Sequence, residues 1–273
     1  ESISNSKVSK EIKFRTPEKL NLDLLYKVHQ KEYVDNFIDG TLSESKQRAI
    51  GLRPWTKDIV DRTLFIMGGG INALDSTIKN GISSNLAGGT HHAHFDYGSG
   101  YCIFNDIALT ANYCKNKYKE YQNILVLDLD VHQGNGTASI FSTNKDVFTI
   151  SFHGKKNYPF RKEKSDIDIE FEDNTDDQFY LNKLKDLIPS AIDNFKPDFI
   201  FYLSGVDVLN NDKLGRLGLS IDGCKERDKF ILELCKANSI PVQVSMGGGY
   251  SELLKNIIDA HSNTFRLAQE IYF

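Results

Sequence analysis

The residues best suited to chemistry are aspartates and a histidine that follow short apolar runs. Asp130 and His132 close the run 124–130, and Asp207 lies just past a second run, 198–204. In an extended strand, residues two apart point to the same side, so Asp130 and His132 are predicted to share one ion, with Asp207 completing the set. Three protein ligands leave a coordination position for water, as in catalytic zinc sites. Two carboxylates make the ion a weaker Lewis acid than three histidines would, and Fe2+ also suits them.

A pair of adjacent histidines, His91-His92, follows Gly88-Gly89. Glycines let the backbone fold tightly at such a point, and neutral imidazole is a natural general base near pH 7. Adjacent histidines are also common in exposed loops, and we assign the nearby His94 to that category. The pair is interpreted as catalytic mainly because of the predicted metal ligands. Tyr250 is either a packed aromatic residue or, if it faces the metal, a hydrogen-bond donor to an oxyanion.

Five apolar runs predict the strands that must position these side chains. They are Ser84–Ala87, Ile124–Asp130, Val147–Phe152, Asp198–Ser204 and Pro241–Ser245. Nearly continuous apolar runs are typical of parallel strands covered on both faces, and the amphipathic stretches 179–195 and 224–237 fit covering helices. Ligands of such sheets bind at the carboxyl ends of the strands. The candidates fall at those ends, so the sequence predicts an α/β fold with a catalytic edge.

The composition is that of an ordinary globular protein. The 273 residues suit one large domain, with 40% hydrophobic and 26% charged residues. We interpret residues 1–13 as a flexible lead-in and residues 14–273 as a single catalytic domain. The net charge of -4 gives no basic footprint for nucleic acid, and no apolar run is long enough to span a membrane. The four cysteines lack C-x-x-C spacing, so we expect free thiols and a cytoplasmic location, a nuclear one being compatible too. Oligomeric state is not readable.

Longer motifs resemble the histone deacetylase family, in consistent order over roughly Leu24 to Tyr250. They are Gly88–Ala93, Gly98–Asp106, Asp128–Gly136, Ser204–Asp207, Asp212–Leu217 and Gly248–Tyr250. Within them, Gln133-Gly134-Asn135 replaces His-Gly-Asp and resembles the class IV branch and its bacterial relatives. The segments Pro54-Trp55, Asn157–Glu163 and Ser165-Asp166 resemble that branch too.

The resemblance implies an arginase/deacetylase fold, with a parallel sheet of about eight strands flanked by helices. It implies a zinc-dependent hydrolase that removes acetyl or longer acyl groups from lysine side chains or related amines by metal-activated water attack. Zinc would be bound by Asp130, His132 and Asp207, and His92 would act as general base and then as acid. An Asn at position 135 holds an imidazolium less well than Asp does, so the pKa of His92 should be lower than in Asp-bearing relatives.

The resemblance also assigns supporting roles. Asp128 would orient His91, Asn135 would orient His92, and Tyr250 would polarise the amide. The substrate tunnel would be lined by Gly100, Tyr101, Tyr158 and Gly248. A potassium ion would be bound by Asp128, Asp130, His132, Ser151 and Phe152. Tyr101 stands where the family usually has Phe. Relatives usually begin with a strand and a His/Pro-containing loop that this chain lacks, so we expect either a removed segment or a more open pocket.

Three other functions share parts of this residue pattern. A dinuclear arginase-like site needs Asp-x-His-x-Asp and Asp-x-Asp, but Gly134 and Leu209 stand at the second-metal positions, so this is disfavoured. An acylpolyamine or small-molecule amide deacetylase uses the same residues. A catalytically impaired acyl-binding module is also open, although every proposed catalytic residue is present.

Overall fold

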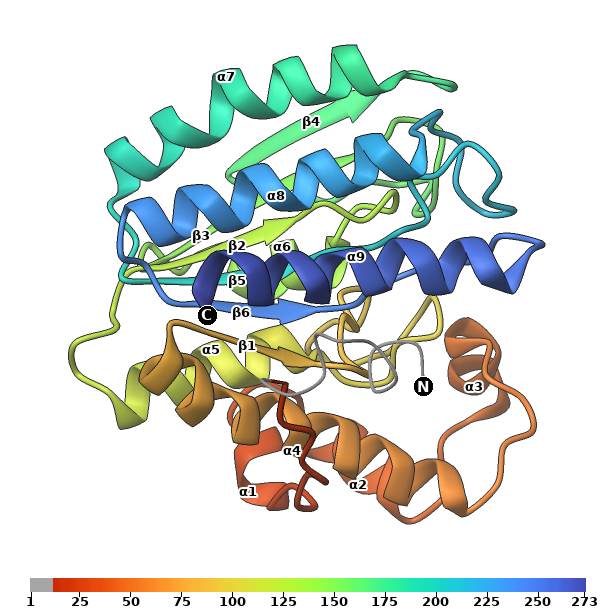
Figure 1. Ribbon diagram of the computed structural model, residues 1–273. Coiled ribbons are helices and arrows are strands. Elements are labelled where there is room, and N and C mark those ends of the chain that lie inside the picture. The colour runs from red at the N-terminus through yellow and green to blue at the C-terminus, as the bar shows by residue number, and fades with distance from the viewer. Residues whose placement is uncertain (1–11) are drawn as a thin grey trace.

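One parallel sheet organises the computed structural model, which describes residues 12–273 (Figure 1). The proposed lead-in, 1–13, therefore falls almost entirely outside the described residues. The strand order is β1-β6-β5-β2-β3-β4, and every neighbouring pair is parallel. The strands are β1 (Ile82–Asn85), β2 (Ile124–Asp128), β3 (Val147–Gly154), β4 (Ile167–Phe171), β5 (Phe199–Leu203) and β6 (Val242–Ser245). The α/β class is confirmed, with six strands in the described part where the resemblance implied about eight.

Helices cover both faces of this sheet. They are α1 (Leu22–Leu25), α2 (Lys31–Ile38), α3 (Glu44–Ile50), α4 (Asp58–Asn80), α5 (Asp106–Lys117), α6 (Asn135–Phe141), α7 (Asp177–Phe195), α8 (Ile221–Ala237) and α9 (Leu254–Tyr272). Figure 1 shows α7, α8 and α9 side by side on one face, with α4 and α5 on the other. The sheet is thus a buried middle layer, as purely parallel sheets require.

The central strands feed two apolar cores because their side chains alternate. In β2, Leu125 and Leu127 belong to the core beneath α7, α8 and α9, whereas Ile124 and Val126 belong to the core beneath α4 and α5. Strand β5 divides its residues in the same way. Burying each such side chain contributes about 1.5–3 kcal/mol, so the two cores hold the carboxyl edge of the sheet in a fixed geometry.

The predicted strands lie within two residues of the observed ones, but β4 was not predicted. Its sequence, Ile-Asp-Ile-Glu-Phe, alternates apolar and acidic residues because it is a half-exposed edge strand. A search for continuous apolar runs passes over such a strand. The carboxyl ends of the strands nevertheless meet at one edge, as predicted.

Candidate metal centre and active site

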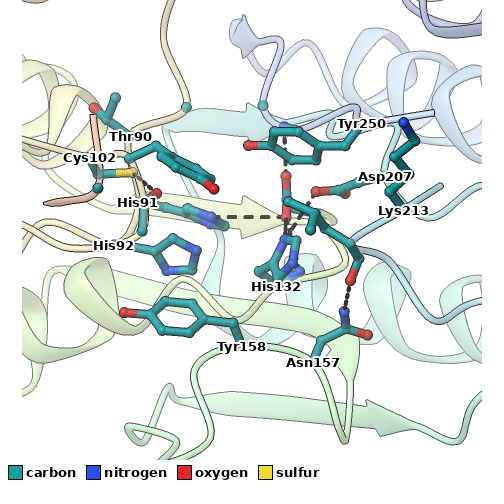
Figure 2. A pocket seen from close by; sticks show the side chains of 18 of the residues that line it. Thr90, His91, His92, Cys102, His132, Asn157, Tyr158, Asp207, Lys213 and Tyr250 are labelled. Carbon is teal, nitrogen blue, oxygen red and sulfur yellow. Dashed lines mark hydrogen bonds and ion pairs between the residues drawn. The ribbon is translucent and has the colours of Figure 1, made fainter. Parts of the chain in front are cut away.

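Asp130, His132 and Asp207 come together at the carboxyl edge of β2 and β5. Their candidate ligand atoms all lie within 4.8 Å of one another. His132 Nδ1 is 3.0 Å from Asp130 Oδ1 and 3.1 Å from Asp207 Oδ2. All three side chains are buried, and Figure 2 shows His132 and Asp207 converging. The predicted set is therefore one cluster.

The prediction that Asp130 and His132 share one face of a strand was wrong. Strand β2 ends at Asp128, so Asp130 and His132 lie in the bend beyond it and not on one face of a strand. Backbone N–H groups shape the bend instead. Asp130 N–H donates to Asp128 Oδ1 (3.1 Å), His132 N–H to Asp130 Oδ1 (2.9 Å) and Val131 N–H to Asp207 Oδ1 (3.0 Å). The carboxylates order the loop that carries them.

The electrostatics of the cluster fit a bound cation. Burial and the neighbouring Asp130 raise the pKa of Asp207 to about 7. Burial by itself would lower the pKa of His132, but its bonds to Asp130 and Asp207 raise it to about 10. Asp130 and Asp207 thus concentrate acidic oxygen atoms at one buried point, within hydrogen-bond distance of the His132 ring. A divalent cation could take the same donor atoms, since metal binding requires them deprotonated.

The adjacent histidines have different partners. His91 Nδ1–H donates to Asp128 Oδ2 and His92 Nδ1–H donates to Asn135 Oδ1, both at 2.7 Å. Burial would lower the pKa of His91, but Asp128 raises it to about 9. Burial and His91 hold the pKa of His92 well below its ordinary value. His91 is therefore suited to carry charge and His92 to accept a proton, and both rings point toward His132 (Figure 2).

Asp106 fixes the loop that carries the histidine pair. It begins α5, and its buried carboxylate accepts the N–H groups of Gly89 and Thr90 and the Thr90 hydroxyl at 2.8–3.1 Å. A Cβ on Gly88 would lie 2.2 Å from Asp106 Oδ2, so glycine is required there. Asp106 ends the motif Gly98–Asp106, but its role in holding this loop was not predicted.

A cavity of about 860 Å³ leads to the cluster. The four predicted tunnel residues, Gly100, Tyr101, Tyr158 and Gly248, all line it. Gly100 has φ +52°, and a Cβ there would lie 2.5 Å from the His92 ring. The Tyr158 ring stands perpendicular to His92 with centroids 4.9 Å apart. A Cβ on Gly248 would lie 2.0 Å from Asp207 Oδ2, so both glycines permit close packing around the site.

Tyr250 lies in the same cavity, on the same side as Asp207 (Figure 2). Its backbone N–H donates to Asp212 Oδ2 at 2.6 Å, which anchors the segment after β6. Burial, Asp130 and Asp207 together raise the pKa of its hydroxyl, so the group stays protonated and able to donate a hydrogen bond. It is a side chain of the site and not merely a packed aromatic residue.

The predicted potassium ligands include Asp130 and His132 of the cluster, and the other three lie on β2 and β3. Asp128 and Ser151 are paired in the register of β2 and β3, and the fully buried Phe152 follows Ser151. Ser151 Oγ also hydrogen-bonds His153 Nδ1 at 3.0 Å. These placements bring the predicted set to one region of the sheet edge.

His94 was predicted wrongly. It was assigned to exposed loop residues, but it is 4% exposed and its Nε2 accepts a hydrogen bond from Asn135 Nδ2 at 2.9 Å. This contact joins residues 41 positions apart, and none of the recognised motifs pairs His94 with Asn135. The mouth of the cavity also holds five side chains that were not among the predicted site residues: Arg62, Lys156, Phe160, Lys213 and Arg216.

A buried Asp-His-Asp cluster beside paired histidines, at the carboxyl edge of a parallel sheet, defines an α/β domain with a metal site of the hydrolase type. The histone deacetylase domain matches residues 1–265, and the chain belongs to that family. It is 40% identical to an uncharacterized protein of Picosynechococcus sp. over 90% of this chain and 81% of that protein. None of the described helices is long and apolar enough to cross a membrane.

Two further relatives are similar over most of this chain. Histone deacetylase 2 of Arabidopsis thaliana is 30% identical over 70% of this chain and half of its own length. The acetoin utilization protein AcuC of Staphylococcus aureus is 28% identical over 89% of this chain and 67% of its own. A crystal structure of the HDA15 HD domain shares the fold, with a TM-score of 0.77 at 20% identity, covering 93% of this chain and 76% of that one.

Proposed function

We propose that the chain is a zinc-dependent amidohydrolase that removes acetyl or longer acyl groups from lysine side chains or related amines. The observation that carries this proposal is the single cluster of Asp130, His132 and Asp207 at the floor of a cavity beside His91 and His92. Within residues 12–273 it is the one group of three acidic, histidine or cysteine ligands at metal-binding distance. That supports a mononuclear site over an arginase-like pair.

The residues divide the reaction between them. A zinc ion held by the cluster would supply Lewis acidity for the attacking water and the amide oxygen, a task that Fe2+ could also fill. His92, whose Nδ1 proton is committed to Asn135, offers Nε2 to take the proton of the water and later deliver it to the departing amine. The Tyr250 hydroxyl donates to the developing oxyanion. His91, held cationic by Asp128, adds positive charge beside it.

The chain fits the class IV branch through Gln133-Gly134-Asn135, where Asn replaces the carboxylate that holds the second histidine elsewhere. A potassium ion held by Asp128, Asp130, His132, Ser151 and Phe152 is part of this proposal. Its test is the thermal midpoint in KCl and in NaCl at equal ionic strength. Equal midpoints over a full titration would remove the potassium site.

The experiment for the main proposal is hydrolysis of fluorogenic acyl-lysine peptides with acetyl, octanoyl and myristoyl chains, before and after chelation. We expect activity that chelator removes and zinc restores. Acylated polyamines are tested in parallel, since turnover of these alone would favour the small-amine alternative. Inactivity of the zinc-loaded protein on every substrate would replace the enzyme with an acyl-binding module. The cytoplasmic location stays a prediction, which rests on four cysteines without C-x-x-C spacing.

A further inference from the structure

Four basic side chains gather at the mouth of the active-site cavity; we call them the basic rim. Arg62 comes from α4, Lys156 from the segment after β3, and Lys213 and Arg216 from the segment between β5 and α8. Apart from the metal cluster, Asp173 is the one acidic residue among the described residues that line this cavity. The mouth is therefore positive, although the whole chain has a net charge of -4.

Ion pairs neutralise this rim only in part. Asp173 Oδ2 is shared between Arg216 Nε at 3.2 Å and Lys156 Nζ at 3.5 Å. Lys213 Nζ is 3.8 Å from Glu252 Oε1, which makes a long and weak ion pair. Arg62 has no carboxylate within 4.0 Å in the described part of the chain. Two acids thus face four bases, and positive charge is left over for a ligand.

The rim side chains are placed to meet a substrate outside the tunnel. The side chains of Lys156, Lys213 and Arg216 are 58%, 57% and 54% exposed, and Figure 2 shows Lys213 beside Tyr250 and Asp207. Phe160, 90% exposed, lines the same mouth and offers an apolar contact. A peptide whose acylated lysine enters the cavity must lay its neighbouring residues across this rim.

We propose that the basic rim binds carboxylates flanking the acylated lysine, so that the preferred substrates are acyl-lysine peptides with acidic neighbours. This inference rests on the proposed function and names its substrate class. Opposite charge at the mouth favours encounter with acidic segments and disfavours polycationic ones. Because the rim is solvent-exposed, the preference should be moderate and should weaken as salt rises.

The test compares fluorogenic acetyl-lysine peptides that differ only in having two Glu or two Lys residues before the acetylated lysine. For the zinc-loaded wild type at low salt we expect kcat/KM to be roughly five-fold higher for the Glu peptide. The double variant Lys156→Gln/Lys213→Gln should bring that ratio close to one. A matched control, Lys119→Gln/Lys145→Gln, removes the same charge just before β2 and β3, at the opposite edge of the sheet, and should keep the wild-type ratio.

The results of this test distinguish failure of the rim proposal from failure of the proposed function. Hydrolysis of both peptides at equal or inverted efficiency overturns the rim proposal and leaves the proposed function standing. A ratio that falls equally in the rim and control variants also overturns it, because net charge would then be responsible. If the zinc-loaded wild type hydrolyses no acyl-lysine peptide, the proposed function fails and the rim proposal fails with it.

A second inference comes from a buried hydrogen-bond chain that runs away from the cavity. His92 Nδ1–H donates to Asn135 Oδ1, and Asn135 Nδ2–H donates to His94 Nε2 at 2.9 Å. Asn135 and His94 are 6% and 4% exposed. His94 does not line the cavity, and the proposed mechanism does not use it. Its ring is nonetheless held in place by stacking on Tyr97, with centroids 4.4 Å apart.

This series of hydrogen bonds can fix the orientation of the Asn135 side chain, because an amide has one donor end and one acceptor end. If the Asn135 amide were reversed, its Nδ2–H would face His92 Nδ1, which would then have to accept. The His92 proton would move to Nε2, the atom that must take the proton of the water. The lone pair of His94 Nε2 favours the productive orientation, since it accepts from Nδ2 and leaves Oδ1 toward His92.

We infer that His94 is a positioning residue, which orients the Asn135 amide and thereby selects the His92 tautomer that can act as a base. Burial lowers the pKa of His94 although Glu163 and Asp96 raise it, which favours the neutral ring that this role requires. The hydrogen bonds are observed in the structure, so only the kinetic test of this inference rests on the proposed function.

The test is His94→Leu beside His94→Gln, since Gln retains an acceptor that can reach Asn135. We expect His94→Leu to lower kcat by about 10- to 100-fold with little change in KM or zinc content, as for other residues behind a catalytic group. His94→Gln should recover most of that loss. In an Asn135→Asp background, where a carboxylate has no wrong orientation, His94→Leu should cost at least five-fold less than in the wild type.

Three results would contradict the proposed role of His94. Equal losses from Leu and Gln at position 94 would show that His94 acts only through packing. Equal losses from His94→Leu in the wild-type and the Asn135→Asp backgrounds would show that amide orientation is not what His94 controls. Loss of zinc from His94→Leu would show that His94 supports the structure of the metal site and does not act through the Asn135 amide alone.

Discussion

The pKa values of the two adjacent histidines depend on the hydrogen-bond partner of each ring. Both rings are buried beside the same cluster, yet a carboxylate holds His91 and an amide holds His92. The carboxylate raises the pKa of His91 to about 9, while the pKa of His92 stays well below its ordinary value. One ring therefore supplies charge and the other accepts a proton, although the sequence places them side by side.

Tyr250 allows a sharp test at this scale. Tyr250→Phe removes one hydroxyl that is expected to bond the oxyanion mainly in the transition state. We expect kcat to fall by about 10²–10³ while KM changes little, as for other donors of this kind. Steady-state kinetics on one acyl-lysine peptide measures both quantities, with Tyr113→Phe on α5 as the control. A kcat equal to that of the control would take Tyr250 out of the mechanism.

Asp207 is the residue whose loss should empty the metal site. Asp207→Ala leaves two ligands and an incomplete site, so zinc content should drop from about one per chain to near zero after dialysis. Atomic absorption on the purified variant measures it. Asp193→Ala, an exposed residue on α7, removes the same charge and should retain zinc. Zinc retained by both variants would mean that another ligand has been overlooked.

At the scale of elements, Asp106 joins the start of α5 to the loop before the histidines. Asp106→Ala leaves the N–H groups of Gly89 and Thr90 without their partner, at a cost of about 1–3 kcal/mol. We expect a lower thermal midpoint and at least a ten-fold lower kcat, with zinc content unchanged because the ligands come from other loops. Calorimetry, kinetics and metal analysis on one preparation test this. A lowered midpoint with full kcat would show that the loop keeps its shape unaided.

The strands could be predicted from the sequence where a local run of apolar residues marks a buried strand. The apolar runs of β2 and β5 and the residues at their ends could be placed because buried parallel strands have a distinctive pattern. The half-exposed β4 has no such pattern. Loops are harder still, since the bend at Asp130 is shaped by bonds from other segments.

The contacts of His94 and the basic rim were not predicted from the sequence, because they too join segments that are distant in the chain. His94 meets Asn135 only after the loop preceding α5 folds against α6. The rim combines one helix with two loops that lie far apart in the chain. Charges scattered at those intervals read as ordinary surface residues, and their clustering is a property of the folded sheet edge.

The whole molecule should be sensitive to acid through buried histidines outside the active site. The pKa values of His29, His153 and His261 are each lowered by burial to about 4. An unfolded histidine has a pKa of about 6.5, so between pH 6.5 and 4 the unfolded chain binds more protons than the native one. The stability that these rings contribute is complete above pH 6.5 and is lost as pH falls toward 4.

His261 on α9 isolates this effect, because its buried Nδ1 has no hydrogen-bond partner among the described residues. His261→Leu removes the titration without breaking a bond at that atom. Relative to wild type, the variant should gain up to about 3 kcal/mol in unfolding free energy between pH 6.5 and pH 4, the equivalent of the pKa difference. Urea unfolding at half-unit pH steps measures both proteins. Parallel curves across that window would mean that His261 protonates as readily in the native fold as in the unfolded chain, and that its burial carries no acid sensitivity.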